Sequence, residues 1–130
     1  MNKGYSVKVE TGSREFNKRE RLMFADIGNA NKLDEIIKAD DDSPFVLAPV
    51  DFAVLSVHNE QSENKDYNVY VLIDGDGNKY VTGSQSFWNS FMDIWEVMHE
   101  DGSNEEFTIE IYKKESKNYK GKYFLTCSIV

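Results

Sequence analysis

The chain of 130 residues contains one cysteine, two prolines and two histidines, and these scarcities narrow its class. Cys127 stands alone, so no internal disulfide can form, which fits a reducing compartment. No apolar run approaches the roughly 18 to 20 residues that span a bilayer. The start MNKGYSVKVE also lacks the apolar stretch of a secretory signal. A cytoplasmic location with no membrane partner is expected.

Residues that could carry catalysis are scarce as well. Neither His58 nor His99 has a cysteine or a second histidine at metal-ligand spacing. Cys127 alternates with Leu125 and Ile129, a pattern typical of a buried structural thiol rather than a nucleophile. No glycine-rich phosphate loop or nucleophile elbow is present. We therefore expect no enzymatic activity, no metal and no cofactor.

The segment DGDGN (74–78) begins like a calcium-binding loop, with aspartate, aspartate and asparagine at alternate positions. The pattern then departs, because Lys79 stands where the glycine is needed and Gln85 where the bidentate glutamate is needed. Glycines at positive φ suit a tight hairpin turn instead.

The length and the composition predict a single domain over residues 1–130. Hydrophobic residues make up 40% of the chain and aromatic residues 13%, which is enough for one core. We divide it into an N-terminal elaboration, residues 1–44, and a barrel, residues 45–130. In the elaboration we expect strands at 5–10 and 21–27. A short helix at 29–39 is expected to bury Leu33, Ile36 and Ile37.

Residues 45–130 show a clearer pattern. Three strands are predicted at 45–58, 67–73 and 79–83, with Pro49 at an edge or a bend of the first. A helix follows at 84–102, where the apolar residues recur on one face. Two more strands are predicted at 106–114 and 122–130. This order is that of an OB-like, five-stranded Greek-key barrel with a helix between strands 3 and 4, in a mainly β fold.

Charge is unevenly distributed. The net charge of −8 argues against indiscriminate binding to nucleic acid. Residues 113–122 nevertheless contain five lysines and one glutamate. Residues 14–21 form a smaller basic cluster, with four cations and two glutamates. The 113–122 segment would join the last two strands, and that loop flanks the ligand face of OB barrels.

Lysines beside exposed aromatic rings suit single-stranded nucleic acid, since ammonium groups neutralise phosphates and rings stack on bases. Alternation predicts that Val69, Val71 and Ile73 face inward and Tyr70 outward. On the last strand, Phe124 shares a face with Lys122 and not with the predicted core residues Tyr123, Leu125, Cys127 and Ile129. The candidate nucleic-acid-binding residues are Tyr70, Lys79, Tyr80, Tyr112, Lys113, Lys114, Lys117, Tyr119, Lys120, Lys122 and Phe124.

Each of these aromatics, taken singly, fits core packing at least as well as stacking on a base. Trp88 lies beside the apolar helix stripe, and two interpretations stay open. It caps the core, which we prefer, or it belongs to an oligomerisation patch.

Three segments resemble small phage-type proteins that bind single-stranded DNA in replication. They are DGNKYVTGSQSF (76–87), the aromatic helix after it, and SKNYKGKYFLTC (116–127). The resemblance covers about residues 45–130. It implies an OB-type fold and binding of displaced single strands during phage DNA replication or recombination, in the host cytoplasm. Replication or recombination proteins and a second copy of the chain stay open as partners.

Two hypotheses follow. The first is sequence-tolerant binding of single-stranded DNA, with phosphates on the lysine-rich loop and bases on exposed aromatics. The alternative is an acidic phage accessory protein that acts through protein–protein interaction, by imitating nucleic acid. Gathered lysines favour the first, and a continuous acidic face favours the second.

Overall fold

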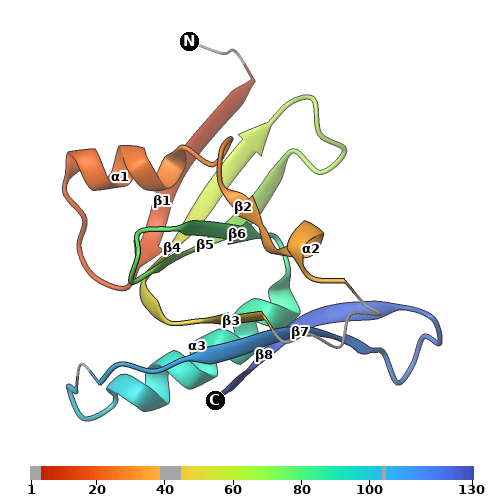
Figure 1. The fold of residues 1–130 in the computed structure, drawn as a ribbon. Coiled ribbons are helices and arrows are strands. Elements are labelled where there is room, and N and C mark those ends of the chain that lie inside the picture. The colour runs from red at the N-terminus through yellow and green to blue at the C-terminus, as the bar shows by residue number, and fades with distance from the viewer. Residues whose placement is uncertain (1–3, 39–44, 104) are drawn as a thin grey trace. The chain divides into compact units, whose positions relative to one another are not determined.

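The computed structural model describes residues 4–38, 45–103 and 105–130, and these are mainly β (Figure 1). The elements in chain order are β1 (Tyr5–Gly12), α1 (Lys18–Ala25), β2 (Asn31–Lys32), α2 (Leu33–Ile36), β3 (Phe45–Leu47), β4 (Pro49–Asn59), β5 (Asp66–Asp74), β6 (Lys79–Thr82), α3 (Gln85–His99), β7 (Ile109–Glu115) and β8 (Tyr123–Ile129). Within the described ranges, no helix is both long and apolar enough to cross a membrane.

The strands form two sheets, with the orders β1-β4-β5-β6-β2 and β3-β7-β8. Among the described strands the hydrogen-bonded ladders stop at β1 and β2 in one sheet and at β3 and β8 in the other, so they do not close into a barrel. The mainly β class and the predicted order of three strands, a helix and two strands are both present. The closed five-stranded barrel is not.

The chain divides into two compact units. Unit 1 comprises Met1–Asn31 and Asp51–Gly83, and unit 2 comprises Lys32–Val50 and Ser84–Val130. The division does not fall at the boundary predicted after residue 44. The reason is that β1, from the N-terminal segment, pairs with β4 along seven register positions and so belongs to the larger sheet.

Unit 1 is built on the apolar face of the larger sheet. Its core contains Phe24 of α1 together with residues of β4, β5 and β6. Phe16 packs on Phe24, with ring centroids 4.5 Å apart. Gly12 allows this packing, because a Cβ on it would lie only 2.2 Å from the ring of Phe16. The core therefore ties the segment after β1 to α1.

The strand predicted at 21–27 is wrong, because Lys18–Ala25 forms the helix α1. A capping box starts this helix: the Asn17 side chain accepts from the N–H of Glu20, and the Glu20 carboxylate accepts from the N–H of Asn17. The apolar run that suggested a strand buries only Phe24, while Leu22 is 73% exposed. Local capping outweighed β propensity here.

The helix predicted at 29–39 is much shorter than expected. Only Leu33–Ile36 is helical, and β2 precedes it. Leu33 and Ile37 are buried as predicted, whereas Ile36 is exposed. The end of the predicted span, from residue 39, lies outside the described residues. No side chain caps α2, which is consistent with its single turn.

The long strand predicted at 45–58 is present but interrupted at Ala48, beside Pro49. Its first part, β3, is an edge strand that pairs with β7, and its second part, β4, lies between β1 and β5. Proline lacks the N–H that a continuous central ladder needs, which explains the change of sheet. The predicted effect of Pro49 is confirmed.

Unit 2 contains the sheet β3-β7-β8 and the helix α3, which runs along β8 (Figure 1). Ser84 caps α3 by accepting from the N–H of Phe87. The Ser86 hydroxyl donates to the Leu125 carbonyl at 2.9 Å. Farther along the helix, the hydroxyls of Ser90 and Thr126 lie 3.0 Å apart. These bonds hold the helix against the last strand.

Trp88 is buried in unit 2 and packs on Phe91, with ring centroids 5.2 Å apart. It therefore contributes to the core, as preferred from the sequence, and does not form an exposed aromatic patch. The same stack continues through Trp95 to His99, whose ring Nδ1 bonds to the Trp95 carbonyl at 2.8 Å.

Candidate nucleic-acid interface

The β7–β8 hairpin of unit 2 carries eight of the eleven candidate residues (Figure 1). Antiparallel pairing sets Tyr112 opposite Thr126 and Lys114 opposite Phe124. Residues paired in this way share one face of the ladder. Phe124 therefore shares a face of the hairpin with Lys114 and Tyr112. Lys114 is exposed on that face and Phe124 is half-buried.

The tip of this hairpin is a compact turn. The N–H of Lys122 donates to the Tyr119 carbonyl at 3.0 Å, and the N–H of Ser116 donates to the Lys122 carbonyl at 2.8 Å. Gly121 has a φ of +84°, a value that L-residues seldom adopt. Glycine at this position lets the chain reverse tightly. In the chain, Lys117 precedes Tyr119 and Lys120 follows it at this turn.

The side chains at the tip are open to solvent. Lys117, Tyr119, Lys120 and Lys122 are all exposed, and the Tyr119 ring is 66% accessible. Within the described ranges, neither these lysines nor Lys114 forms an ion pair. Exposed ammonium groups without a carboxylate partner can neutralise the charge of a ligand. We call Lys114, Lys117, Tyr119, Lys120 and Lys122 the hairpin cluster.

Two predicted members at the base of the hairpin are engaged with the protein. The Lys113 Nζ donates to the Asp34 carbonyl at 3.2 Å, which ties β7 to α2. The Tyr112 hydroxyl bonds to the Ser128 hydroxyl at 2.8 Å and leaves the ring half-buried. The polar groups of these two residues are therefore bonded within the protein, at the base of the hairpin.

Tyr123 is a residue that the alternation argument assigned to the core, and the structure corrects that assignment. Its ring is 47% exposed, and its hydroxyl lies 3.4 Å from a Glu115 carboxylate oxygen. Ile129, assigned to the same core face, is also exposed, whereas Leu125 and Cys127 are buried. The face keeps its predicted alternation, but its two ends extend beyond the packed part of the strand.

Tyr70 belongs to unit 1 and was expected to face outward. It is only 5% exposed, so its ring is not available for stacking. Leu72 and Val71, on opposite faces of the same strand, are also buried. The strand β5 lies between β4 and β6 and is covered on both faces, which period-2 reasoning could not reveal.

Lys79 and Tyr80 serve the structure of unit 1. The Lys79 ammonium donates to the carbonyl of Met23 and, at 2.7 Å, to that of Asp26. These carbonyls lie at the C-terminal end of α1, where a cation is favourable. The Tyr80 hydroxyl lies 3.5 Å from Asp74, and burial together with that carboxylate raises the pKa of Tyr80.

The segment 74–78 forms the predicted hairpin turn. One Asp74 carboxylate oxygen accepts from the N–H groups of Asp76 and Asn78, at 3.0 and 2.9 Å. Burial acts to raise the pKa of Asp74, but the hydrogen bonds from Asn78 and Asp76 outweigh it and lower the pKa. The carboxylate is thus occupied by the turn itself. No group of three metal-ligating side chains occurs among the described residues.

Cys127 and His58 are two further side chains with reactive groups. Burial raises the pKa of the Cys127 thiol to about 12, so the thiolate is scarce at neutral pH. The two His58 ring nitrogens lie 2.8 Å from Asp66 and 2.7 Å from Glu60. Carboxylates on both sides favour the doubly protonated ring, and these bonds, that of Asp66 first, raise the pKa of His58.

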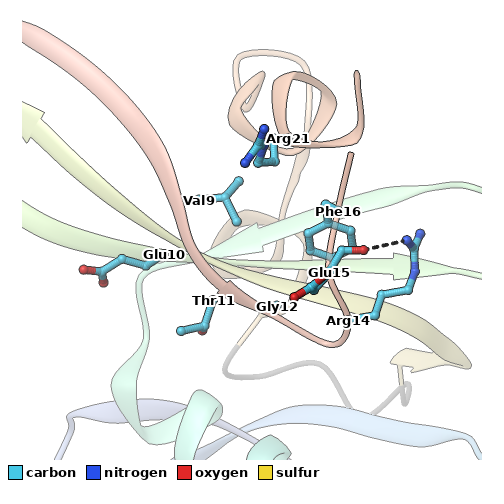
Figure 2. A pocket seen from close by; sticks show the side chains of 8 residues that line it. All are labelled: Val9, Glu10, Thr11, Gly12, Arg14, Glu15, Phe16 and Arg21. Carbon is cyan, nitrogen blue, oxygen red and sulfur yellow. Dashed lines mark hydrogen bonds between the residues drawn. The ribbon is translucent and has the colours of Figure 1, made fainter. Parts of the chain in front are cut away.

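Two hollows beside α1 were not foreseen. The first, of about 660 Å³, is lined by residues of β1, the following loop and α1 (Figure 2). Of its two arginines, Arg14 is paired with Glu20 and with Asp51, and the Arg14 guanidinium lies over the Phe16 ring at 4.9 Å. The second, of about 620 Å³, is lined by Val7, Lys8, Val9, Lys18, Arg21, Leu22 and Ala25. The basic residues at 14–21 were the only sequence signal for either hollow.

Comparison with known proteins gave no match: no family model, curated protein or solved structure is significantly similar to the chain. The candidate interface is therefore argued from its own residues.

Proposed function

We propose that the chain binds single-stranded DNA in a sequence-tolerant manner, through the hairpin cluster, during phage DNA replication or recombination. The observation that carries the proposal is that four exposed lysines and the exposed Tyr119 ring lie on one hairpin. Such a surface offers cations to successive phosphates and a flat ring to a base. Tyr123, exposed at the start of β8, is a second stacking candidate.

The proposal includes an OB-like arrangement of the strands. Strand order supports it: β4, β5 and β6 are consecutive neighbours, and β7 returns after α3 to pair with β3, the first part of the bent strand. When β3 and β4 are counted as one bent strand, this sequence of neighbours matches the 4-1-2-3 order of a Greek key with the helix between the third and fourth strands. In OB folds the loop between strands 4 and 5 borders the ligand face, and here that loop is the hairpin tip.

A fluorescence titration with labelled oligo-dT tests the proposal. We expect binding at low salt, with log Kd rising against log salt by about 0.7 for each phosphate neutralised. The Lys117→Glu/Lys120→Glu variant should weaken binding by at least about tenfold, since it replaces two attractive charges with two repulsive ones. Absence of binding at low salt would refute the function.

The matched control is Lys32→Glu/Lys38→Glu, which changes the net charge equally at two exposed lysines outside the hairpin. It should weaken binding much less than the hairpin variant does. Equal weakening would mean that net charge, and not this hairpin, governs the affinity. Competition with RNA and with duplex DNA in the same assay defines the preferred strand, since stacking on Tyr119 requires unpaired bases.

A further inference from the structure

The outer edge of β1 is an unpaired sheet edge in the described part of unit 1, because β1 pairs only with β4. The direction of its backbone groups follows from two hydrogen bonds. The N–H of Glu60 donates to the Gly4 carbonyl at 2.6 Å, while that of Asn59 donates away from β1, to Lys65 at 2.7 Å. Antiparallel alternation then directs the N–H and carbonyl groups of Val7 and Val9 outward.

A groove lies along this edge, between β1 and α1. It is the hollow of about 620 Å³ described above. Its apolar lining comes from Val7 and Val9 of the strand and from Leu22 and Ala25 of the helix. Leu22 is 73% exposed, so its side chain is accessible to a ligand in this groove. The groove thus places outward-facing backbone N–H and carbonyl groups of β1 next to exposed apolar surface.

The charged residues of the groove are all cationic: Lys8, Lys18 and Arg21, each exposed. Within the described ranges none of the three forms an ion pair. The neighbouring hollow differs, because its Arg14 is already paired with two carboxylates. Figure 2 shows that Val9 and Arg21, which line both hollows, point toward one another, while Glu10 points away.

We propose that this groove binds an extended peptide segment of a partner protein, rich in acidic and apolar side chains, which adds to β1 as a further strand. Its backbone pairs with the outward groups of Val7 and Val9. Because the side chains of a strand alternate between its two faces, every second residue points toward α1. These residues include apolar side chains that contact Leu22 and Ala25 and carboxylates that meet Lys18 and Arg21. Strand addition of this kind takes affinity from main-chain bonds and specificity from alternate side chains.

A second copy of the chain fits the groove less well than an acidic segment does. Pairing of β1 with β1 of another copy would continue the sheet about a two-fold axis. Both α1 helices would then lie on the same face of that sheet. Lys18 and Arg21 of one copy would face the same residues of the other, and like charges across a seam are unfavourable. Cationic edge residues are a common means by which proteins avoid such self-pairing.

The proposal is independent of DNA binding by the hairpin, which belongs to unit 2. The probe is a fluorescein-labelled peptide of about seven residues, the length of one strand, in which every second residue is in turn glutamate or valine and the residues between them are serine. Fluorescence anisotropy with the full chain should show saturable binding. The Lys18→Glu/Arg21→Glu variant should weaken it by at least about tenfold, whereas Lys32→Glu/Lys38→Glu should leave it within about twofold.

A second probe separates strand addition from charge attraction alone. The same peptide, N-methylated at alternate amides, keeps every carboxylate but cannot complete the ladder, so it should bind at least about tenfold more weakly. Equal binding of the two peptides, or no binding of either at low salt, would overturn the proposal. Displacement of the peptide by oligo-dT would instead identify the groove as a phosphate site. A dimer that sedimentation detects and that Lys18→Glu/Arg21→Glu stabilises would identify it as a self-association edge.

Discussion

Arg14 and Lys79, which lie beside α1, and the lysines of the hairpin cluster are all cations, but of these only Arg14 and Lys79 form side-chain bonds within the described part of the chain. In the α1 region, Arg14 forms ion pairs with Glu20 and Asp51. These contacts raise the pKa of Arg14, and the hydrogen bond to Glu20 has the largest effect. Lys79 is bound by carbonyls at the end of α1. In the hairpin, Lys117 and Lys120 extend from a turn with no such partner among the described residues.

This difference shows that the number of lysines does not by itself mark a binding site. A cation that already satisfies a carboxylate or a helix terminus contributes to the fold, and its removal leaves partners without their bond. A cation without such a partner is free to meet a ligand and can be replaced at little cost in stability. The two regions therefore make opposite predictions for the same kind of substitution.

The largest expected effect is on the packing of α1. Phe24→Ala removes a ring that is 1% exposed and should lower the free energy of unfolding by about 3–5 kcal/mol. Urea denaturation followed by circular dichroism measures it. The control Leu22→Ala, on the same helix but largely exposed, should change stability by less than about 0.5 kcal/mol. A similar loss for both variants would contradict the assignment of Phe24 as the residue that holds α1.

The comparison is sharpened by one substitution made in each region. Lys79→Met keeps most of the apolar stem and removes the ammonium that binds the end of α1, so it should cost about 1 kcal/mol of stability. Lys114→Met should cost less than about 0.5 kcal/mol, since Lys114 is exposed. Titration with oligo-dT should give the reverse order, with weaker binding only for Lys114→Met. A loss of DNA affinity in Lys79→Met would show that Lys79 contacts the ligand after all.

The cap of α1 gives an effect of about the same size. Asn17→Ala removes the side chain that accepts from the N–H of Glu20 and should destabilise the chain by about 1 kcal/mol. Asn118→Ala, at the exposed hairpin tip, serves as the control and should be nearly neutral. Thermal unfolding of the two variants measures the difference. Equal melting temperatures would mean that the capping box contributes nothing to the fold.

The smallest effect is a pH dependence in unit 1. Asp66 and Glu60 raise the pKa of His58, so their contacts with the protonated ring add to the free energy of unfolding. This contribution is fully present below the unfolded pKa of about 6.5 and is lost as pH rises through the higher folded value. An NMR titration of the His58 ring should show a raised pKa, and Asp66→Asn should bring it down. A ring that titrates at or below the unfolded value would exclude these contacts.

Much of the fold from residue 45 onward is predictable because its elements follow regular periods. Alternation identified β7 and β8, and the helical stripe identified α3. Pro49 marked the place where the first strand changes sheets. The segment 21–27 was mistaken for a strand because its apolar run resembles one, while the deciding signal, the box formed by Asn17 and Glu20, lies before it.

The candidate site was predictable only in part. The position of the lysines next to a glycine turn indicated the exposed tip, because a turn extends beyond the packed part of a sheet. Burial of Tyr70 depends on what covers β5, and the partners of Lys79 come from a helix more than fifty residues earlier in the chain. Such long-range contacts leave no local pattern, so single-strand periodicity cannot reveal them.

The exchange of sheets at Ala48 also affects how the chain can fold during its synthesis. Unit 1 is complete once Gly83 has been made, whereas unit 2 needs the last strand. β3 is synthesised before the second part of unit 1, Asp51–Gly83, but it pairs with β7, which follows α3. Until β7 has left the ribosome, Val46 and Leu47 have no β7 strand to pair with, so this short segment stays without that partner while α3 is made.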